Sequence, residues 1–67
     1  MQATYDKQAN ALYLQLKPGK VKKTLELRDD LLVDVDTNDD IVGVEFLHPE
    51  KFFPEVATSK QIPLSKA

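Results

Sequence analysis

Hydrophobic and polar residues alternate one by one along four successive stretches of the chain. Successive side chains of an extended strand point to opposite faces, so a period of two is typical of strands with one buried face. The pattern predicts strands at residues 11–17, 20–28, 31–37 and 40–47, preceded by a shorter strand at 2–6. No helical periodicity of comparable length precedes residue 48.

Short segments rich in Pro, Gly, Asn and Asp separate these stretches and predict tight turns. Residues 17–20, Lys-Pro-Gly-Lys, have Pro and Gly at the positions that a type II turn favours. Residues 37–40, Thr-Asn-Asp-Asp, suit a longer loop because Asn and Asp tolerate a positive φ. We therefore expect a single antiparallel meander of four to five strands, each paired with the next along the chain.

The loop lengths also predict a register that sorts nearly all apolar residues to one face of the sheet. One row of the apolar face then consists of Leu12, Leu25, Val33 and Val44. The corresponding row of the polar face consists of Tyr13, Thr24, Asp34 and Gly43. A slip of one residue would turn the carboxylates into the core. The residues that close the three loops are paired as Leu16 with Val21, Leu27 with Leu31, and Asp36 with Ile41. In the rows that follow from this register, Lys22 lies beside Asp36 and Val35 beside Val42.

A short C-terminal helix is expected after the sheet, over residues 49–54, with Pro49 at a favourable first position. Phe52 and Phe53 in this segment are expected to cover the apolar face. The predicted fold class is therefore mainly β, or α+β if the short helix is counted. Residues 1–54 form the predicted single domain, and residues 55–67 form a polar C-terminal tail.

The small size of the chain favours association with another chain. With 67 residues, of which 42% are hydrophobic, it has room for one domain. In such domains apolar burial and the cost of ordering the chain nearly cancel, so a further stabilising element is usual. The chain has no cysteine, which excludes disulfides and thiolate metal clusters. We therefore expect a homodimer or a complex with a small partner protein.

Charge is distributed unevenly along the chain. Residues 24–50 contain nine acids and one arginine, whereas the stretch before them is rich in lysine. An acidic middle section disfavours nucleic acid, and the lysines at 17–23 are interpreted as protection for a sheet edge. Contact of these lysines with nucleic acid is a remaining alternative. No apolar run reaches the ~18 residues of a membrane span and no signal-peptide pattern is visible, so a cytoplasmic protein without membrane contact is expected.

One acidic stretch has the spacing of an EF-hand calcium loop. The matching residues are Asp34, Asp36, Asn38, Asp40, Ile41 and Glu45. The sharp turn of such a loop requires Gly where this chain has Asp39, and the flanking residues alternate like strands rather than helices. We therefore expect an acidic hairpin with no metal site and no cofactor, and weak cation binding at the turn is the alternative.

Candidate catalytic residues are few. His48 is the only histidine, and we interpret it as a residue at the start of a helix. The acids Asp34, Asp36 and Glu45 support an alternative function, a small metal-dependent or acid/base enzyme whose site forms at a dimer interface. Paired acid and base roles require a pocket that desolvates one carboxylate, and a single open sheet offers little pocket. A non-enzymatic protein is therefore the preferred interpretation.

A surface for protein contact is predicted on the polar face, where Tyr13, Leu32 and Ile41 form a small apolar island among acids. Tyr13 has a second interpretation, in which its ring shields Gly43 and the backbone. The predicted contact residues are Tyr13, Leu32, Ile41, Phe52 and Phe53. The preferred function is a protein-binding module that self-associates or pairs with a small partner.

Residues 5–16, YDKQANALYLQL, resemble the opening signature of a small prokaryotic family, the domain of unknown function 2283, whose usual form is YD-x-x-ADALYI-x-L. Residues 24–26, 32–36 and 41–47 are also similar to this family, so the resemblance covers roughly residues 3–53. The chain departs from the family at Asn10, where Asp is usual. The resemblance implies a small β-rich fold without an established activity. It also implies a small, toxin-like partner protein encoded by an adjacent gene, and the acidic face of this chain would suit a basic, RNA-cleaving partner by charge complementarity.

Overall fold

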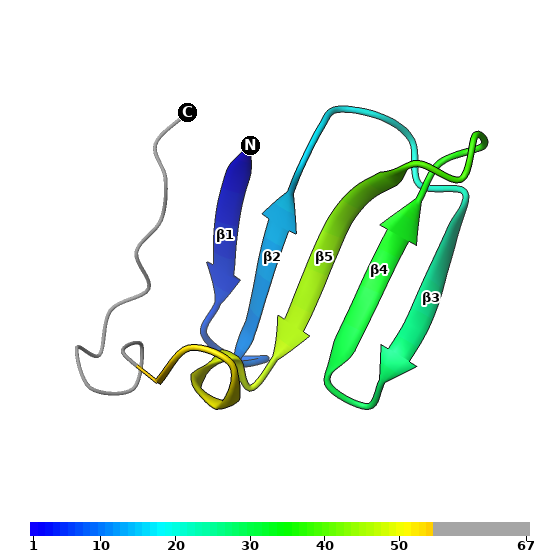
Figure 1. The fold of residues 1–67 in the computed structure, drawn as a ribbon. Coiled ribbons are helices and arrows are strands. Elements are labelled where there is room, and N and C mark those ends of the chain that lie inside the picture. The colour runs from blue at the N-terminus through cyan, green and yellow to red at the C-terminus, as the bar shows by residue number, and fades with distance from the viewer. Residues whose placement is uncertain (55–67) are drawn as a thin grey trace.

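The computed structural model describes residues 1–54, which form a five-stranded antiparallel sheet followed by one 3-10 turn (Figure 1). The elements are β1 (Gln2–Asp6), β2 (Ala11–Gln15), β3 (Lys23–Arg28), β4 (Leu31–Val35), β5 (Ile41–Leu47) and η1 (Pro49–Lys51). All five predicted strands are therefore confirmed, the first with the predicted bounds and the others one to three residues shorter. The predicted tail, residues 55–67, lies outside the described residues.

The strand order is β1-β2-β5-β4-β3, so the predicted meander is wrong at one connection. β2 pairs with β5 instead of β3, and residues 16–22 carry the chain across the ends of β5 and β4 to the far edge (Figure 1). Three consecutive hairpin-connected strands, with a fourth returning beside the first by a long connection, form a Greek key. The predicted pair between Leu16 and Val21 is therefore not formed.

The composition of β2 and β3 explains this exchange of neighbours. Between β1 and β5, β2 places Leu12 opposite Phe46 and Leu14 opposite Val44. The polar strand β3 takes the edge, where every one of its residues is exposed. Gly19 has a φ of +155°, which differs from the value of about +80° in a type II turn, and it lies within the crossing segment instead of closing a hairpin. This segment stays against the sheet because the N–H of Leu16 donates to the carbonyl of Val42 at 2.7 Å.

The hairpins β3–β4 and β4–β5 are formed in the predicted register through most of their length. Val33 is opposite Leu25 and Val44, and Asp34 is opposite Thr24 and Gly43. The row of the apolar face and the row of the polar face are thus confirmed for these three strands. Leu12 and Tyr13 join the same two faces from the side of β5.

Two irregularities correct the register near the strand ends. The ladder shifts between Glu26 and Arg28, so Arg28 rather than Leu27 is opposite Leu31. A second shift after Asp34 places Val35 opposite Ile41, whereas the sequence predicts Val42 there. Such bulges insert one unpaired residue and increase the local twist, which loop lengths alone do not predict.

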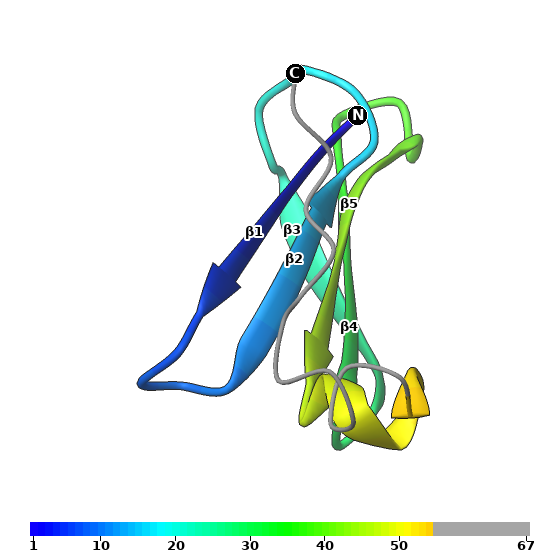
Figure 2. The same ribbon diagram turned by 90° about the vertical axis from the view of Figure 1, so that its left-hand side faces the viewer.

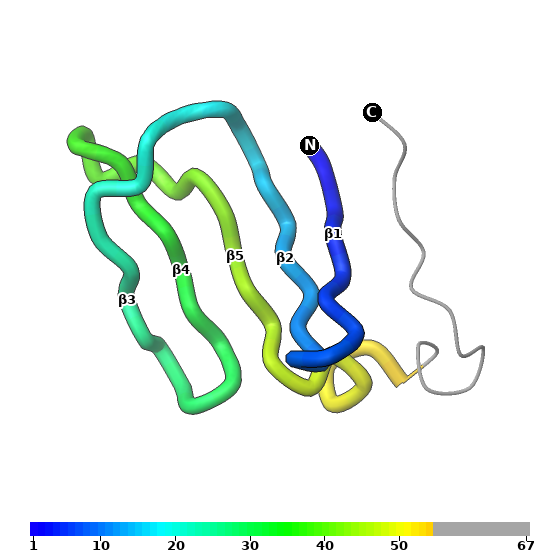
Figure 3. The backbone as a smooth tube through the Cα atoms, turned by 180° about the vertical axis from the view of Figure 1, so that it is seen from behind, coloured from blue at the N-terminus to red at the C-terminus, as the bar shows by residue number. Residues whose placement is uncertain are grey.

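The core lies on the apolar face and is small. Its buried apolar residues are Ala11, Leu12, Val33, Val35 and Val42, of which Ala11 comes from the opposite face. Figure 2 shows the strong twist of the sheet from the side, and Figure 3 shows the crossing segment and η1 at opposite ends of it. None of the described residues forms a helix long and apolar enough to cross a membrane.

The predicted helix over residues 49–54 is instead a single 3-10 turn, with Pro49 at its start as expected. Pro54 lacks an N–H, and its ring would clash with the carbonyl of Glu50 in an α-helix. The expected covering of the apolar face is confirmed. The rings of Phe52 and Phe53 each meet the ring of Phe46 edge-on, with centroids 5.1 Å apart.

Candidate functional site

The polar face carries a hydrogen-bonded group of side chains centred on Asp34. The Tyr13 hydroxyl donates to Asp34 Oδ2 at 2.9 Å, and the Thr24 hydroxyl donates to Asp34 Oδ1 at 2.5 Å. Tyr13 lies on β2 and Asp34 on β4, with β5 between them. The group therefore links four adjacent strands, since the Tyr13 ring has to pass over β5 to reach the carboxylate.

Gly43 is the residue of β5 over which the Tyr13 ring passes. A Cβ atom added at Gly43 would overlap the hydroxyl and the neighbouring ring carbon of Tyr13. The interpretation of Tyr13 as a shield for Gly43 is thus confirmed by direct contact. In the predicted meander, β3 and β4 would lie between these residues, and the exchange of β3 and β5 brings them together.

The environment of Tyr13 holds its proton on the hydroxyl. Burial raises the pKa of Tyr13 above its ordinary value, and the hydrogen bond to Asp34 and the negative charges of Asp34 and Glu45 act in the same direction. A general base needs the opposite shift, toward neutral pH. The arrangement is therefore that of a neutral donor that ties strands together.

The acidic loop that resembles a calcium site directs its second carboxylate, Asp36, at its own backbone. Asp36 Oδ1 accepts hydrogen bonds from the N–H groups of Asn38 at 2.8 Å and Asp40 at 3.0 Å. Its other oxygen lies 3.3 Å from the Lys17 ammonium, which also contacts Asp40 at 3.2 Å. Asp36 is thus paired with Lys17, where the sequence predicts Lys22. Within residues 1–54, no group of three or more His, Cys, Asp or Glu residues is arranged to hold a metal ion.

These contacts shift two pKa values. The hydrogen bond from the Asp40 N–H is the largest cause that lowers the pKa of Asp36, and the bonds from Asn38 and Lys17 add to it. The hydrogen bond to Asp40 raises the pKa of Lys17, with a further contribution from Asp36. Both side chains remain charged at neutral pH and act as a cap for the loop.

Asn10 is the centre of a second polar group, at the end of the sheet near η1. It adopts a left-handed conformation with φ of 51°, and its side-chain oxygen accepts from the Tyr5 hydroxyl at 2.9 Å. Its amide nitrogen donates to Glu50 at 3.2 Å and lies 3.3 Å from His48 Nδ1. Sequence reasoning missed this role. The available signal was Asn10 itself, which stands where the family that this chain resembles usually has Asp. An amide side chain can both accept from Tyr5 and donate to Glu50, whereas a carboxylate only accepts.

His48 lies at the start of η1, as its interpretation from the sequence expects. The backbone N–H of His48 donates to the backbone carbonyl of Asn10 at 2.9 Å, and the φ of His48 is 55°. The hydrogen bond from its own backbone N–H lowers the pKa of the Glu50 carboxyl most, and the hydrogen bond from Asn10 lowers it further. This group therefore fixes where the chain leaves β5.

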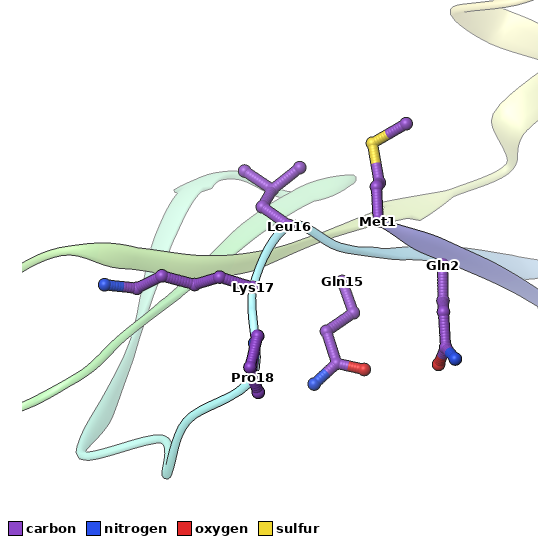
Figure 4. A pocket seen from close by; sticks show the side chains of 6 residues that line it. All are labelled: Met1, Gln2, Gln15, Leu16, Lys17 and Pro18. Carbon is purple, nitrogen blue, oxygen red and sulfur yellow. The ribbon is translucent and has the colours of Figure 1, made fainter. Parts of the chain in front are cut away.

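Two open hollows border these groups. The first, of about 410 Å³, is lined by Met1, Gln2, Gln15, Leu16, Lys17 and Pro18 (Figure 4). Met1 and Leu16 point to one side of the strands and the two glutamines to the other (Figure 4). The second, of about 490 Å³, lies between the β3–β4 turn and η1. One carboxylate oxygen of Asp30 is buried there, 3.6 Å from Arg28 Nε.

The predicted contact residues do not form one surface. Tyr13 and Leu32 lie on the polar face, whereas the register shift between β4 and β5 places Ile41, which is 48% exposed, opposite the buried Val35. Phe52 and Phe53 pack on Phe46, on the opposite face. A role of these residues in binding stays a prediction.

An apolar surface that sequence reasoning assigned to the core is exposed instead. Leu25 is 40% exposed, Leu27 60% and Val21 47%. The position of β3 at the edge causes this exposure, because only β4 flanks these side chains. We call Val21, Leu25 and Leu27 the β3 apolar edge.

Comparison with known proteins agrees with the resemblance. The model of a family described as a protein of unknown function, DUF2283, matches residues 2–48. An uncharacterized protein of Methanocaldococcus jannaschii, MJ0789, is 45% identical over 49 residues, which cover 73% of this chain and 41% of that protein. The chain thus matches about two fifths of the length of this relative. No solved structure matches the chain.

Proposed function

This chain belongs to the DUF2283 family of proteins of unknown function, and from that premise we propose that it is a non-enzymatic module that binds another polypeptide chain. The proposal rests on one observation. The β3 apolar edge is exposed although the strands contribute only five buried apolar side chains. A sheet that leaves apolar side chains uncovered gains stability when another chain covers them.

The contacts of the acidic groups support a structural rather than a catalytic role. Asp34 accepts two hydroxyl hydrogen bonds, and Asp36 caps a loop. The raised pKa of Tyr13 keeps it protonated at the pH where a base would have to act. The groups that an acid/base mechanism would use are thus engaged in holding strands and turns.

Two classes of partner fit this proposal. A second copy of the chain would cover the β3 apolar edge with an identical one. A small basic protein would complement the acids of residues 24–50 on the polar face, and charge complementarity of this kind speeds association and excludes wrong partners. The adjacent-gene arrangement implied by the family resemblance makes such a protein the heteromeric candidate.

Sedimentation equilibrium of the purified chain at micromolar concentration tests the proposal. We expect a mass above the 7.6 kDa of the monomer, and a weaker complex when Leu27→Ser removes the most exposed leucine. Ile41→Ser is the matched control, because Ile41 is similarly exposed but lies on β5, outside the β3 apolar edge. Co-expression with the product of the adjacent gene covers the second partner class. A monomer that also fails to bind this product refutes the proposal.

A further inference from the structure

We infer that the partner at the β3 edge is a second copy of this chain, joined by antiparallel pairing of the two β3 strands about a two-fold axis. This inference rests on the proposed function and names its partner and its site. It would join two five-stranded sheets into one continuous sheet.

The first support is the state of the β3 edge. An edge strand presents unpaired N–H and C=O groups along one side, which pair readily with another strand. All six residues of β3 are exposed, whereas the strand on its other side, β4, is buried or half-buried throughout. The opposite edge, β1, contains no large aliphatic side chain. Edge pairing at β3 therefore covers apolar surface as well as backbone groups.

The second support is the distribution of charge along this edge. Lysines precede Thr24, at positions 20, 22 and 23, and acids follow it, at positions 26, 29 and 30. Antiparallel pairing about a two-fold axis places the basic half of one strand against the acidic half of the other. Parallel pairing would place lysine beside lysine, and like charges directly opposite each other are destabilising. The edge is thus complementary to itself in one orientation.

A particular register follows when the two-fold axis passes Thr24. Lys22 of each copy is then opposite Glu26 of the second copy, and both lie on the polar face with Thr24. On the apolar face, Val21 is opposite Leu27 of the second copy, so two exposed side chains cover each other. Lys22 is in line with the ladder, since its N–H donates to the Val35 carbonyl at 2.8 Å.

Lysines and a bulge commonly protect an edge strand against unwanted pairing, and β3 has both. Here the lysines lie on one half of the edge alone, and the bulge follows Glu26. They exclude the orientations that bring lysines together and leave the two-fold antiparallel one. Lys23 and Arg28 are held in ion pairs within their own chain, with Asp39 at 3.7 Å and Asp30 at 3.6 Å.

A charge-swap experiment tests this register. In a homodimer of the Lys22→Glu variant, the glutamate at position 22 of each copy faces Glu26 of the second copy. In a homodimer of the Glu26→Lys variant, the lysine at position 26 of each copy faces Lys22 of the second copy. We expect each variant alone to dissociate at least ten-fold more readily than the parent chain. An equimolar mixture of the two variants should associate again, because every such pair is then of opposite charge. Native mass spectrometry distinguishes the mixed dimer by mass when one of the two variants is labelled with 15N.

Lys7→Glu is the matched control, since it makes the same charge change in the exposed β1–β2 turn. Circular dichroism of each variant verifies that the sheet is intact. Failure of the mixture to restore association, or equal dimerisation of the variants and the control, would overturn the β3 pairing while leaving the proposed function standing. A parent chain that is monomeric yet binds the adjacent gene product would also overturn the pairing alone. A parent chain that binds neither itself nor that product would overturn both.

Discussion

The contact between Tyr13 and Gly43 gives the sharpest test of the fold. Gly43→Ala adds a Cβ atom at a position already occupied by the Tyr13 ring. The ring is held there by its hydrogen bond to Asp34, so it has to give up this bond or strain the backbone of β5. Overpacking of this kind costs about 1–3 kcal/mol, and we expect a loss of about 2 kcal/mol in the free energy of unfolding.

The same substitution should change sign when the ring is removed. In a Tyr13→Ala background, the space above residue 43 is open, and alanine in a strand is favoured over glycine by roughly 0.5–1 kcal/mol. Gly43→Ala should therefore stabilise the Tyr13→Ala variant slightly. The coupling free energy of this double-mutant cycle is expected to be about 2–3 kcal/mol.

Urea denaturation followed by circular dichroism measures all four chains of the cycle. One protein concentration has to be used throughout, because association would add to the apparent stability. An equal cost of Gly43→Ala in both backgrounds would refute the reasoning. It would mean that β2 and β5 are not neighbours, and the sheet order would then be wrong.

Three further predictions follow from the core and the acidic loop. Val33→Ala should lower the free energy of unfolding by about 2 kcal/mol in urea denaturation, because the Val33 side chain is buried in the middle of the apolar face. Asp39→Asn should leave this free energy unchanged, because Asp39 is exposed. The reverse order of effects would contradict the register. Because the pKa of Asp36 is lowered, its charged form stabilises the fold above its ordinary pKa, and this stabilisation is lost as pH falls through the lowered value. Asp36→Asn should therefore flatten the acid side of a profile of melting temperature against pH, below about pH 5. An unchanged profile would argue against the cap. Calorimetry should show no one-to-one micromolar binding of calcium to residues 34–45, because Asp36 is engaged by backbone N–H groups, and a saturable micromolar isotherm would disprove this.

The alternating pattern alone determined the strands, their faces and three of the hairpins. Side-chain alternation in a strand is a local property, and a short loop leaves little choice of register. Asp34 opposite Thr24 and Gly43 was therefore predictable, as was the packing of the C-terminal phenylalanines on the apolar face. The bulges were not, since one extra residue in a strand leaves no mark in the pattern.

The neighbour of β2 was decided by the tertiary structure. Residues 16–22 are long enough to close a hairpin or to cross the sheet, so local geometry permits both. The crossing places the apolar side chains of β2 beside Phe46 and Val44 and leaves the charged strand β3 in water. The strand order therefore depends on how much apolar surface each whole strand buries, and this burial depends on residues far apart in the sequence. It also creates the contact of Tyr13 with Gly43 and the exposed β3 apolar edge, and neither feature can be predicted until the strand order is known.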